Sequence, residues 1–196
     1  MRKSKLISSL IPSSLLIFSP IFLSSCSNTN KALVIYFSCT NNTKDVADKI
    51  VNYLHCDSFQ IQPTIPYNPA TDFGPEGRAN IEQANPTARP AISNNITNFG
   101  AYSHFFIGYP IWAGTLPKII YTLCDAYDFN HKTIIPFCTS TETPITTSEN
   151  ELKMLEKQAN FINSKGFIYS SLPSQNDVDN WIKSLNLSLK YYLKFN

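Results

Sequence analysis

The segment from Ala32 to Lys44 constrains the fold of this chain more than any other part of it. It begins with a run of aliphatic and aromatic residues, continues into a cluster of hydroxyl and amide side chains, and then starts an amphipathic helical pattern. A buried strand that runs directly into a helix is the repeating unit of α/β folds. The helix N-terminus offers unpaired N–H groups and a partial positive charge, to which Ser38, Thr40 and Thr43 can add hydroxyl donors. The turn is therefore predicted to hold a phosphate group.

Two motifs that the turn does not contain narrow the choice of ligand. It lacks the Gly-Lys-Ser/Thr ending of a triphosphate-binding loop, and it lacks the Gly-x-Gly-x-x-Gly dinucleotide fingerprint. A phosphate monoester remains as the candidate ligand. The same hydroxyls could instead simply cap a helix, and Thr43 is the expected cap.

The first 25 residues are typical of a targeting segment rather than of a folded element. A basic stretch, Met1–Lys5, precedes a mostly apolar run broken by two prolines, and small residues then lead to Cys26. This is the layout of a secretory signal peptide, and its end is similar to a bacterial lipobox, in which the cysteine is acylated and becomes the first mature residue. An ordinary signal peptide with an incidental cysteine, or a membrane-spanning anchor, are the alternatives. We expect residues 1–25 to be a lipoprotein signal and 26–31 a tether, with the domain lipid-anchored to the bacterial cell membrane outside the cytoplasm.

Charge and cysteine content argue against several function classes. The chain has 16 basic and 14 acidic residues, and three of the basic ones lie in the predicted signal, so the remainder is nearly neutral. No basic stripe indicates nucleic-acid binding. The cysteines beyond Cys26 include no Cys-x-x-Cys pair and the three histidines are scattered, so neither a metal site nor a disulfide framework is predicted, although one pair could close in an oxidising compartment. Cys39 stands out because a thiol at a helix N-terminus normally has a lowered pKa.

Strand and helix patterns alternate along the rest of the chain. Strands are predicted at 32–38, 58–62, 104–109, 133–138 and 167–170, and helices at 43–54, 116–127, 148–165 and 175–187. Ser148 and Glu151 are expected to form a capping box, and Gly166 is expected to end that helix. The stretch from 63 to 100 holds six of the 13 prolines and one short helical pattern at 76–85, so it is either a functional loop or an excursion over the surface.

This alternation predicts a three-layer α/β domain with a doubly wound, five-stranded parallel sheet. Ligands of such sheets bind beyond the carboxyl ends of the strands, where three turns with unusual residues would meet: 38–43, 108–117 and 138–144. In the second turn, Trp112 offers a stacking surface for a flat heteroaromatic ring, or it packs on the neighbouring prolines. Trp181 has apolar helical neighbours and is expected in the core.

Several motifs occur in the order and spacing seen in bacterial flavodoxins, which the chain resembles over nearly all of residues 32–190, leaving 191–196 as a tail. The motifs are Phe37-Ser38-x-Thr40-x-Asn42-Thr43-Lys44, Gly108-Tyr109-Pro110-Ile111-Trp112-x-Gly114-Thr115-Leu116-Pro117 and Tyr127-Asp128-Phe129-x-x-Lys132-Thr133-Ile134-Ile135-Pro136-Phe137. Arg89-Pro90-Ala91-Ile92 and Val178-Asp179-x-Trp181 are similar to the subgroup often found as lipoproteins. The resemblance implies the strand order 2-1-3-4-5.

The resemblance also implies non-covalently bound FMN and a role in electron transfer, either as a carrier or as a small flavin or quinone oxidoreductase. The redox donor and acceptor would lie at the membrane or outside the cytoplasm. Carried over by position, the phosphate would be held by Ser38, Cys39, Thr40, Asn41, Asn42 and Thr43. The ring would be flanked by Tyr109, Pro110, Ile111, Trp112, Ala113 and Gly114, and its pyrimidine edge would meet Thr139, Ser140, Thr141 and Glu142. Ala113 or Gly114 would be the site of the peptide flip that accompanies flavin reduction.

The chain departs from the family pattern at three places. Asn41 stands where the family usually has glycine, although asparagine tolerates a left-handed conformation better than most residues. Ala113 stands where the subgroup usually has a second tryptophan, and the third loop has no glycine. A flavodoxin-like binding or structural lipoprotein that has lost its cofactor is therefore the alternative function.

Overall fold

The structure is a computed structural model that describes residues 30–189. The predicted signal, Cys26 with most of the predicted tether, and the C-terminal tail lie outside this range. The strands are β1 Ala32–Tyr36, β2 Asp57–Gln60, β3 His104–Pro110, β4 Thr133–Ser140, β5 Asn160–Phe161 and β6 Lys165–Ile168. The helices are α1 Asn42–Leu54, α2 Arg78–Ala84, the 3₁₀ turn η1 Phe99–Ala101, α3 Lys118–Ala126, α4 Thr146–Leu155 and α5 Gln175–Ser184.

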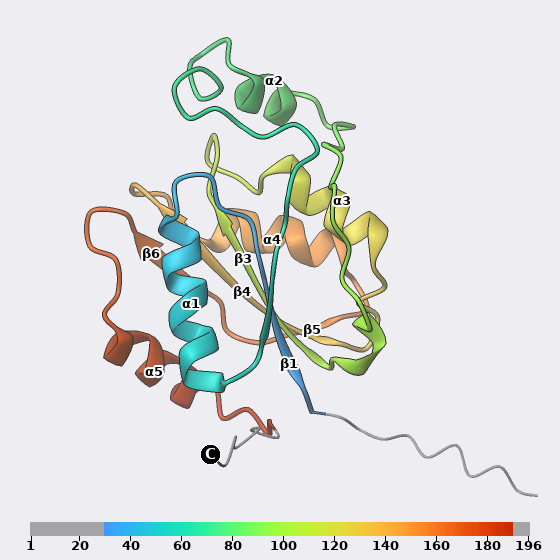
Figure 1. Cartoon of the computed structure of the whole chain (residues 1–196), viewed down its shortest axis with the longest axis vertical. Coiled ribbons are helices and arrows are strands. Elements are labelled where there is room, and N and C mark those ends of the chain that lie inside the picture. Colours follow the sequence, from blue (N-terminus) through green and yellow to red (C-terminus); the bar gives the residue numbers. More distant parts are fainter. Residues whose placement is uncertain (1–29, 190–196) are drawn as a thin grey trace, which may run out of the picture.

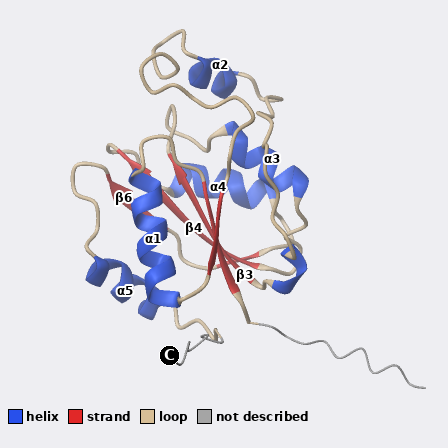
Figure 2. Cartoon of the chain, viewed as in Figure 1, coloured by secondary structure: helices blue, strands red, loops and turns tan. Residues whose placement is uncertain are grey.

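The strands form one parallel sheet in the order β2-β1-β3-β4-β5, with β6 also paired to β4, and this confirms the predicted order 2-1-3-4-5. Helices α1 and α5 cover one face and α3 and α4 the other, which gives the three layers seen in Figure 1 and Figure 2. Helix α2 lies apart from these layers, beyond the edge at which β1 and β3 end (Figure 1).

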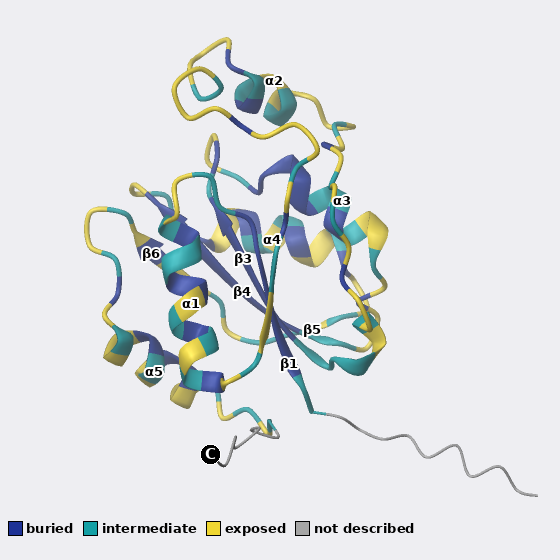
Figure 3. Ribbon diagram, viewed as in Figure 1, coloured by how far each residue is buried: buried dark blue, intermediate teal, exposed yellow. Residues whose placement is uncertain are grey.

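Each central strand is buried on both faces, so its side chains divide between two cores (Figure 3). Leu33 and Ile35 of β1 pack with α3 and α4, while Val34 and Tyr36 pack with α1 and α5. Trp181 belongs to the second core, where its ring meets Phe106 edge-on at 6.0 Å between centroids, so the sequence-based placement of this tryptophan is confirmed. These two cores fix the ends of the strands, and with them the loops that leave the sheet.

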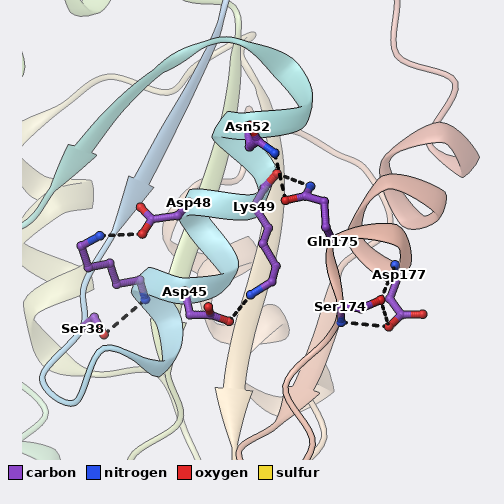
Figure 4. Close-up of polar contacts among 9 residues, drawn as sticks. Ser38, Asp45, Asp48, Lys49, Asn52, Ser174, Gln175 and Asp177 are labelled. Atoms are coloured by element: carbon purple, nitrogen blue, oxygen red, sulfur yellow. Dashed lines mark hydrogen bonds and ion pairs between the residues drawn. The ribbon is translucent and has the colours of Figure 1, made fainter.

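Polar contacts join α1 to α5 on the outer surface (Figure 4). The Gln175 amide donates to the Lys49 carbonyl, and the Asn52 amide donates to the Gln175 side-chain oxygen at 3.1 Å. Helix α5 begins at a capping box in which Ser174 and Asp177 satisfy each other's backbone N–H groups. These contacts hold α1, and therefore the turn in front of it, against the rest of the domain.

The fifth strand position is shared by β5 and β6, because β4 pairs with β5 at Thr133 and Ile134 and with β6 from Phe137 onward. Pro136 of β4 lies between the two paired stretches. The Ile134 carbonyl accepts a hydrogen bond from the Ile162 N–H, so the backbone groups of Ile134 point toward the side of β5 and β6. Residues two apart in a strand point their backbone groups to the same side, so the position where Pro136 lacks an N–H faces the gap between β5 and β6. The proline therefore sits where its lost ladder bond costs least.

The largest error of the sequence-based prediction is the helix at 148–165, since α4 ends at Leu155 and the chain then forms β5. Ser148 is not a cap: it is buried inside α4, and its hydroxyl donates to the Ile145 carbonyl. The capping box with Glu151 is absent from α4, and Gly166 lies within β6 rather than at a helix end. Apolar residues at 155, 159, 161 and 162 fit a helical period, but the Asn160 N–H bonds to the Lys132 carbonyl and draws this segment into the sheet.

Other boundaries shift by a few residues. The short helix is Arg78–Ala84 rather than 76–85, and the last helix ends at Ser184 rather than at 187. Thr43 lies inside α1 and does not cap it; Asn41 occupies the cap position without a side-chain cap bond. None of the helices within residues 30–189 is long and apolar enough to cross a membrane.

Candidate functional site

A cavity of about 240 Å³ opens at the carboxyl ends of the central strands. It is formed by all three predicted turns together with two segments that the strand pattern did not implicate. Its walls are Ser38, Cys39, Thr40, Thr43, Phe73, Pro110, Ile111, Trp112, Thr141 and Tyr169. None of these side chains carries a charge at neutral pH, and hydroxyls and aromatic rings face the same space. The sequence-based prediction that the three turns meet at one rim is confirmed by this cavity.

The first turn, residues 38–43, lies at the cavity: Ser38, Cys39, Thr40 and Thr43 line it, whereas the predicted Asn41 and Asn42 do not. Asn41 adopts the left-handed conformation at φ 65°, so it does take the role of the glycine expected there. The Lys44 N–H bonds to the Ser38 hydroxyl at 3.3 Å (Figure 4), and the Asp45 N–H begins the helical ladder at the Asn41 carbonyl. Within the described residues, the N–H groups of residues 40–43 have no acceptor. Four free donors at a helix N-terminus form a site for an oxyanion.

A buried hydroxyl pair stands behind this turn. Thr43 of α1 and Thr139 of β4 are both almost fully buried, and their Oγ1 atoms lie 2.8 Å apart. This bond ties the first turn of α1 to the end of the fourth strand, 96 residues away in sequence. Thr139 was predicted to contact the ligand. It does not line the cavity, whereas Thr43, its hydrogen-bond partner, does.

The second turn is a tight hairpin at the cavity mouth. Trp112 and Thr115 exchange both backbone hydrogen bonds, at 3.1 and 3.0 Å. Between them Ala113 and Gly114 both have positive φ, at 47° and 81°, which is the conformation of a type I′ turn. A left-handed alanine costs roughly 1–2 kcal/mol, so Ala113 stores strain beside the cavity. Both residues are exposed, and neither lines the cavity.

The Trp112 side chain is packed against other residues, because only 9% of the residue is exposed to solvent. Its ring meets Phe37, Tyr67 and Phe73 edge-on, at centroid distances of 5.2, 4.9 and 4.9 Å. The ring therefore belongs to an aromatic cluster that also reaches into the 63–100 segment. The cluster holds the Trp112 ring in place while part of it remains on the cavity wall.

Hydrogen bonds from the Gln83 side chain connect α2, in the 63–100 segment, to the second turn. Its amide group donates to the Trp112 carbonyl at 3.3 Å and to the Leu116 carbonyl at 3.0 Å. Its side-chain oxygen accepts from the Lys118 N–H at 3.0 Å, at the start of α3. One side chain therefore satisfies three backbone groups on both sides of the hairpin. The long proline-rich stretch acts as a structural support of the site as well as an excursion over the surface.

The third turn contributes less to the cavity than predicted. Thr141 lines it, but Glu142 is exposed and does not, and the buried Ser140 hydroxyl bonds to the Thr143 carbonyl at 2.7 Å. Tyr109 of β3 is fully buried and its hydroxyl donates to Ser148, so its side chain lies beneath the site rather than beside a ligand. Pro110 and Ile111, which follow it, do line the cavity.

The prediction for the Cys39 thiol is wrong in sign. Burial raises its pKa to about 12, and the nearby Arg78 guanidinium offsets only part of this effect. The loss of solvent outweighs the favourable field of the helix N-terminus, so the thiol stays protonated at neutral pH. Cys39, Cys56, Cys124 and Cys138 are all free thiols.

Phe73 and Tyr169 are the two cavity residues that sequence reasoning missed. Phe73 comes from the 63–100 segment, where no regular pattern pointed to the sheet edge. Tyr169 follows β6 directly, but the predicted last strand at 167–170 placed it inside a strand. A strand that ends at Ile168 would have marked Tyr169 as a strand-end residue, which is the position of ligand contacts in this architecture.

Comparison with known proteins shows to which family the chain is similar. The sequence model of the flavodoxin family matches residues 31–185. A candidate flavoprotein of Bacteroides uniformis shares 31% identity, with a TM-score of 0.74 over 79% of this chain and 99% of that one. A candidate flavoprotein of Bacteroides eggerthii shares 32% identity, with a TM-score of 0.72 over 81% and 99% of the two chains.

A more distant structure supports the fold alone. It is a flavoprotein of Lactobacillus acidophilus, solved in complex with FMN, with 20% identity and a TM-score of 0.62 over 81% of this chain and 99% of that one. A search of curated proteins gives no match.

Proposed function

Because this chain belongs to the flavodoxin family, we propose that it binds FMN non-covalently at the cavity beyond the strand ends and works as an electron-transfer protein. The observation that carries the proposal is that one cavity joins a turn of unpaired N–H donors to an aromatic wall. FMN has the matching chemistry, since it carries a phosphate monoester at one end and a flat ring at the other. The fold by itself would not suffice, because folds host many functions.

The phosphate of FMN would be held by neutral donors. The N–H groups of residues 40–43 supply the backbone contacts, and Ser38, Thr40 and Thr43 supply hydroxyls. No lysine or arginine among residues 30–189 lines the cavity, so the positive end of the α1 dipole would provide the favourable potential. Asn41 keeps the required left-handed turn, so the missing glycine does not count against this assignment.

The ring would lie against the second turn. Trp112, Ile111 and Phe73 offer the apolar wall, and the aromatic cluster behind Trp112 keeps that wall rigid. Rigid aromatic walls bind flat ligands with little loss of conformational freedom. The bound flavin supplies the redox chemistry, and the protein controls the potential through contacts and local charge.

Two tryptophans make a direct test possible, because the chain has only Trp112 and Trp181. In Trp181→Phe the remaining indole lies on the cavity wall, whereas in Trp112→Phe it lies in the core. FMN added to each variant should quench the fluorescence of the first protein far more strongly than that of the second, at equal fractional binding. Equal quenching in the two variants would place FMN away from Trp112 and reject the site.

We also propose that the domain is tethered by lipid on Cys26 outside the cytoplasm, which would require a redox donor at the membrane or beyond it. The basis is the sequence pattern of residues 1–26. Replacement of Cys26 by serine should move the protein from the membrane fraction to the soluble fraction. Cys56→Ser is the matched control, since Cys56 lies in the folded domain. A Cys26→Ser protein that stays in the membrane fraction would reject the lipobox.

A further inference from the structure

Tyr169 stands at the cavity on a segment that belongs to none of the three predicted turns. Its N–H donates to the Ser140 carbonyl at 2.8 Å, which extends the pairing of β6 with β4 by one residue. The chain then turns back at once, because the Ser171 N–H bonds to the Ile168 carbonyl. The backbone of Tyr169 is therefore fixed at the sheet edge, and its side chain is half-buried on the cavity wall.

The register of β4 and β6 places Tyr169 on the α1 side of the sheet. Thr139 pairs with Phe167, and the Thr139 Oγ1 atom lies 2.8 Å from the Thr43 Oγ1 atom in the first turn of α1. Phe167 packs in the core that α1 and α5 cover. Tyr169 follows Phe167 by two residues, and alternate side chains of a strand share one face, so Tyr169 extends the same face toward the start of α1.

The Tyr169 phenol keeps its proton at neutral pH, because burial raises its pKa more than the Thr139 hydroxyl lowers it. A protonated, half-buried phenol on a cavity wall can donate a hydrogen bond to an anion bound in that cavity.

We propose that Tyr169 is a further cofactor-binding residue, whose phenolic hydroxyl donates to the phosphate held by residues 38–43. This rests on the proposed FMN function. Tyr169 lines the same cavity as Ser38, Thr40 and Thr43, and the register of β6 places it on the side of the sheet where α1 begins. A phosphate oxygen bound at that turn is a matching acceptor for the phenolic proton. The site would then be built from four segments rather than three.

The test compares FMN with riboflavin, which has the same ring and no phosphate. Tyr169→Phe keeps the aromatic ring and removes only the hydroxyl. A hydrogen bond to a charged group predicts that the variant binds FMN roughly tenfold or more weakly, while its affinity for riboflavin is unchanged. Tyr53→Phe is the matched control, because Tyr53 lies on α1 beside Lys183, away from the cavity.

Each outcome separates the two proposals. Equal losses for FMN and riboflavin would mean that Tyr169 contacts the ring, and unchanged FMN affinity would mean that it contacts nothing; either result overturns the inference. A native protein that binds neither flavin would instead reject the proposed function.

Circular dichroism and a thermal melt of Tyr169→Phe and Tyr53→Phe ensure that folded proteins are compared.

Discussion

Gln83 offers a test of how the 63–100 segment supports the site. Its side chain makes three hydrogen bonds to the backbone of residues 112–118, and it is itself half-buried. A net contribution of about 1 kcal/mol for each bond predicts that Gln83→Ala lowers the free energy of unfolding by about 2–3 kcal/mol. For a domain of this size, such a loss lowers the melting temperature by roughly 5–10 °C. The affinity for FMN should fall as well, because the hairpin that carries Trp112 loses its support.

Urea denaturation followed by circular dichroism measures the loss of stability directly. Gln158→Ala, at an exposed position with no side-chain hydrogen bond among the described residues, is the matched control. Gln83→Glu adds a sharper comparison: it keeps an acceptor for the Lys118 N–H but sets a carboxylate against two carbonyl oxygens. It should therefore be at least as destabilising as alanine at neutral pH. A loss below about 0.5 kcal/mol in Gln83→Ala, no larger than in the control, would refute the role of this residue.

Two further predictions follow from buried titratable groups. Burial raises the pKa of Glu156 above that of an unfolded glutamate, so its contribution to stability is present at low pH and is lost as the pH rises through the folded-state value. Glu156→Gln should therefore raise the melting temperature at neutral pH and leave it nearly unchanged near about pH 4, and a lower melting temperature at neutral pH would contradict this. The Cys39 thiol, whose pKa is about 12, should react with iodoacetamide far more slowly than a free cysteine at neutral pH, with a rate that rises about tenfold per pH unit. A fast reaction at neutral pH in the folded protein, measured by mass spectrometry, would show that the thiolate is stabilised after all.

The parts of the fold that sequence reasoning predicted well are those where one pattern has one physical meaning. Short apolar runs bounded by turn residues, such as Phe105–Ile107, favour central strands, and the polar turns that follow them mark the ligand edge. The positive φ of Asn41 was likewise foreseeable, because asparagine tolerates it and the turn requires it.

The errors arise where tertiary contacts decide between equivalent patterns. The apolar residues within 156–165 fit a helical period, but pairing of Asn160 and Phe161 with β4 makes a short strand there instead. The charge state of Cys39 depends on side chains that bury it from the 63–100 segment, which no local pattern reveals. Phe73 and Tyr169 reach the cavity from segments whose path is set by packing alone.

The most direct test of the account is a titration of the purified full chain with FMN, followed by flavin fluorescence and visible absorption. The account predicts that each chain binds one FMN with a dissociation constant below about 1 μM and that the bound flavin loses fluorescence. Absence of binding at high micromolar FMN, in a protein whose circular dichroism shows the native fold, would contradict it. The domain would then be a flavodoxin-like scaffold that works without the cofactor.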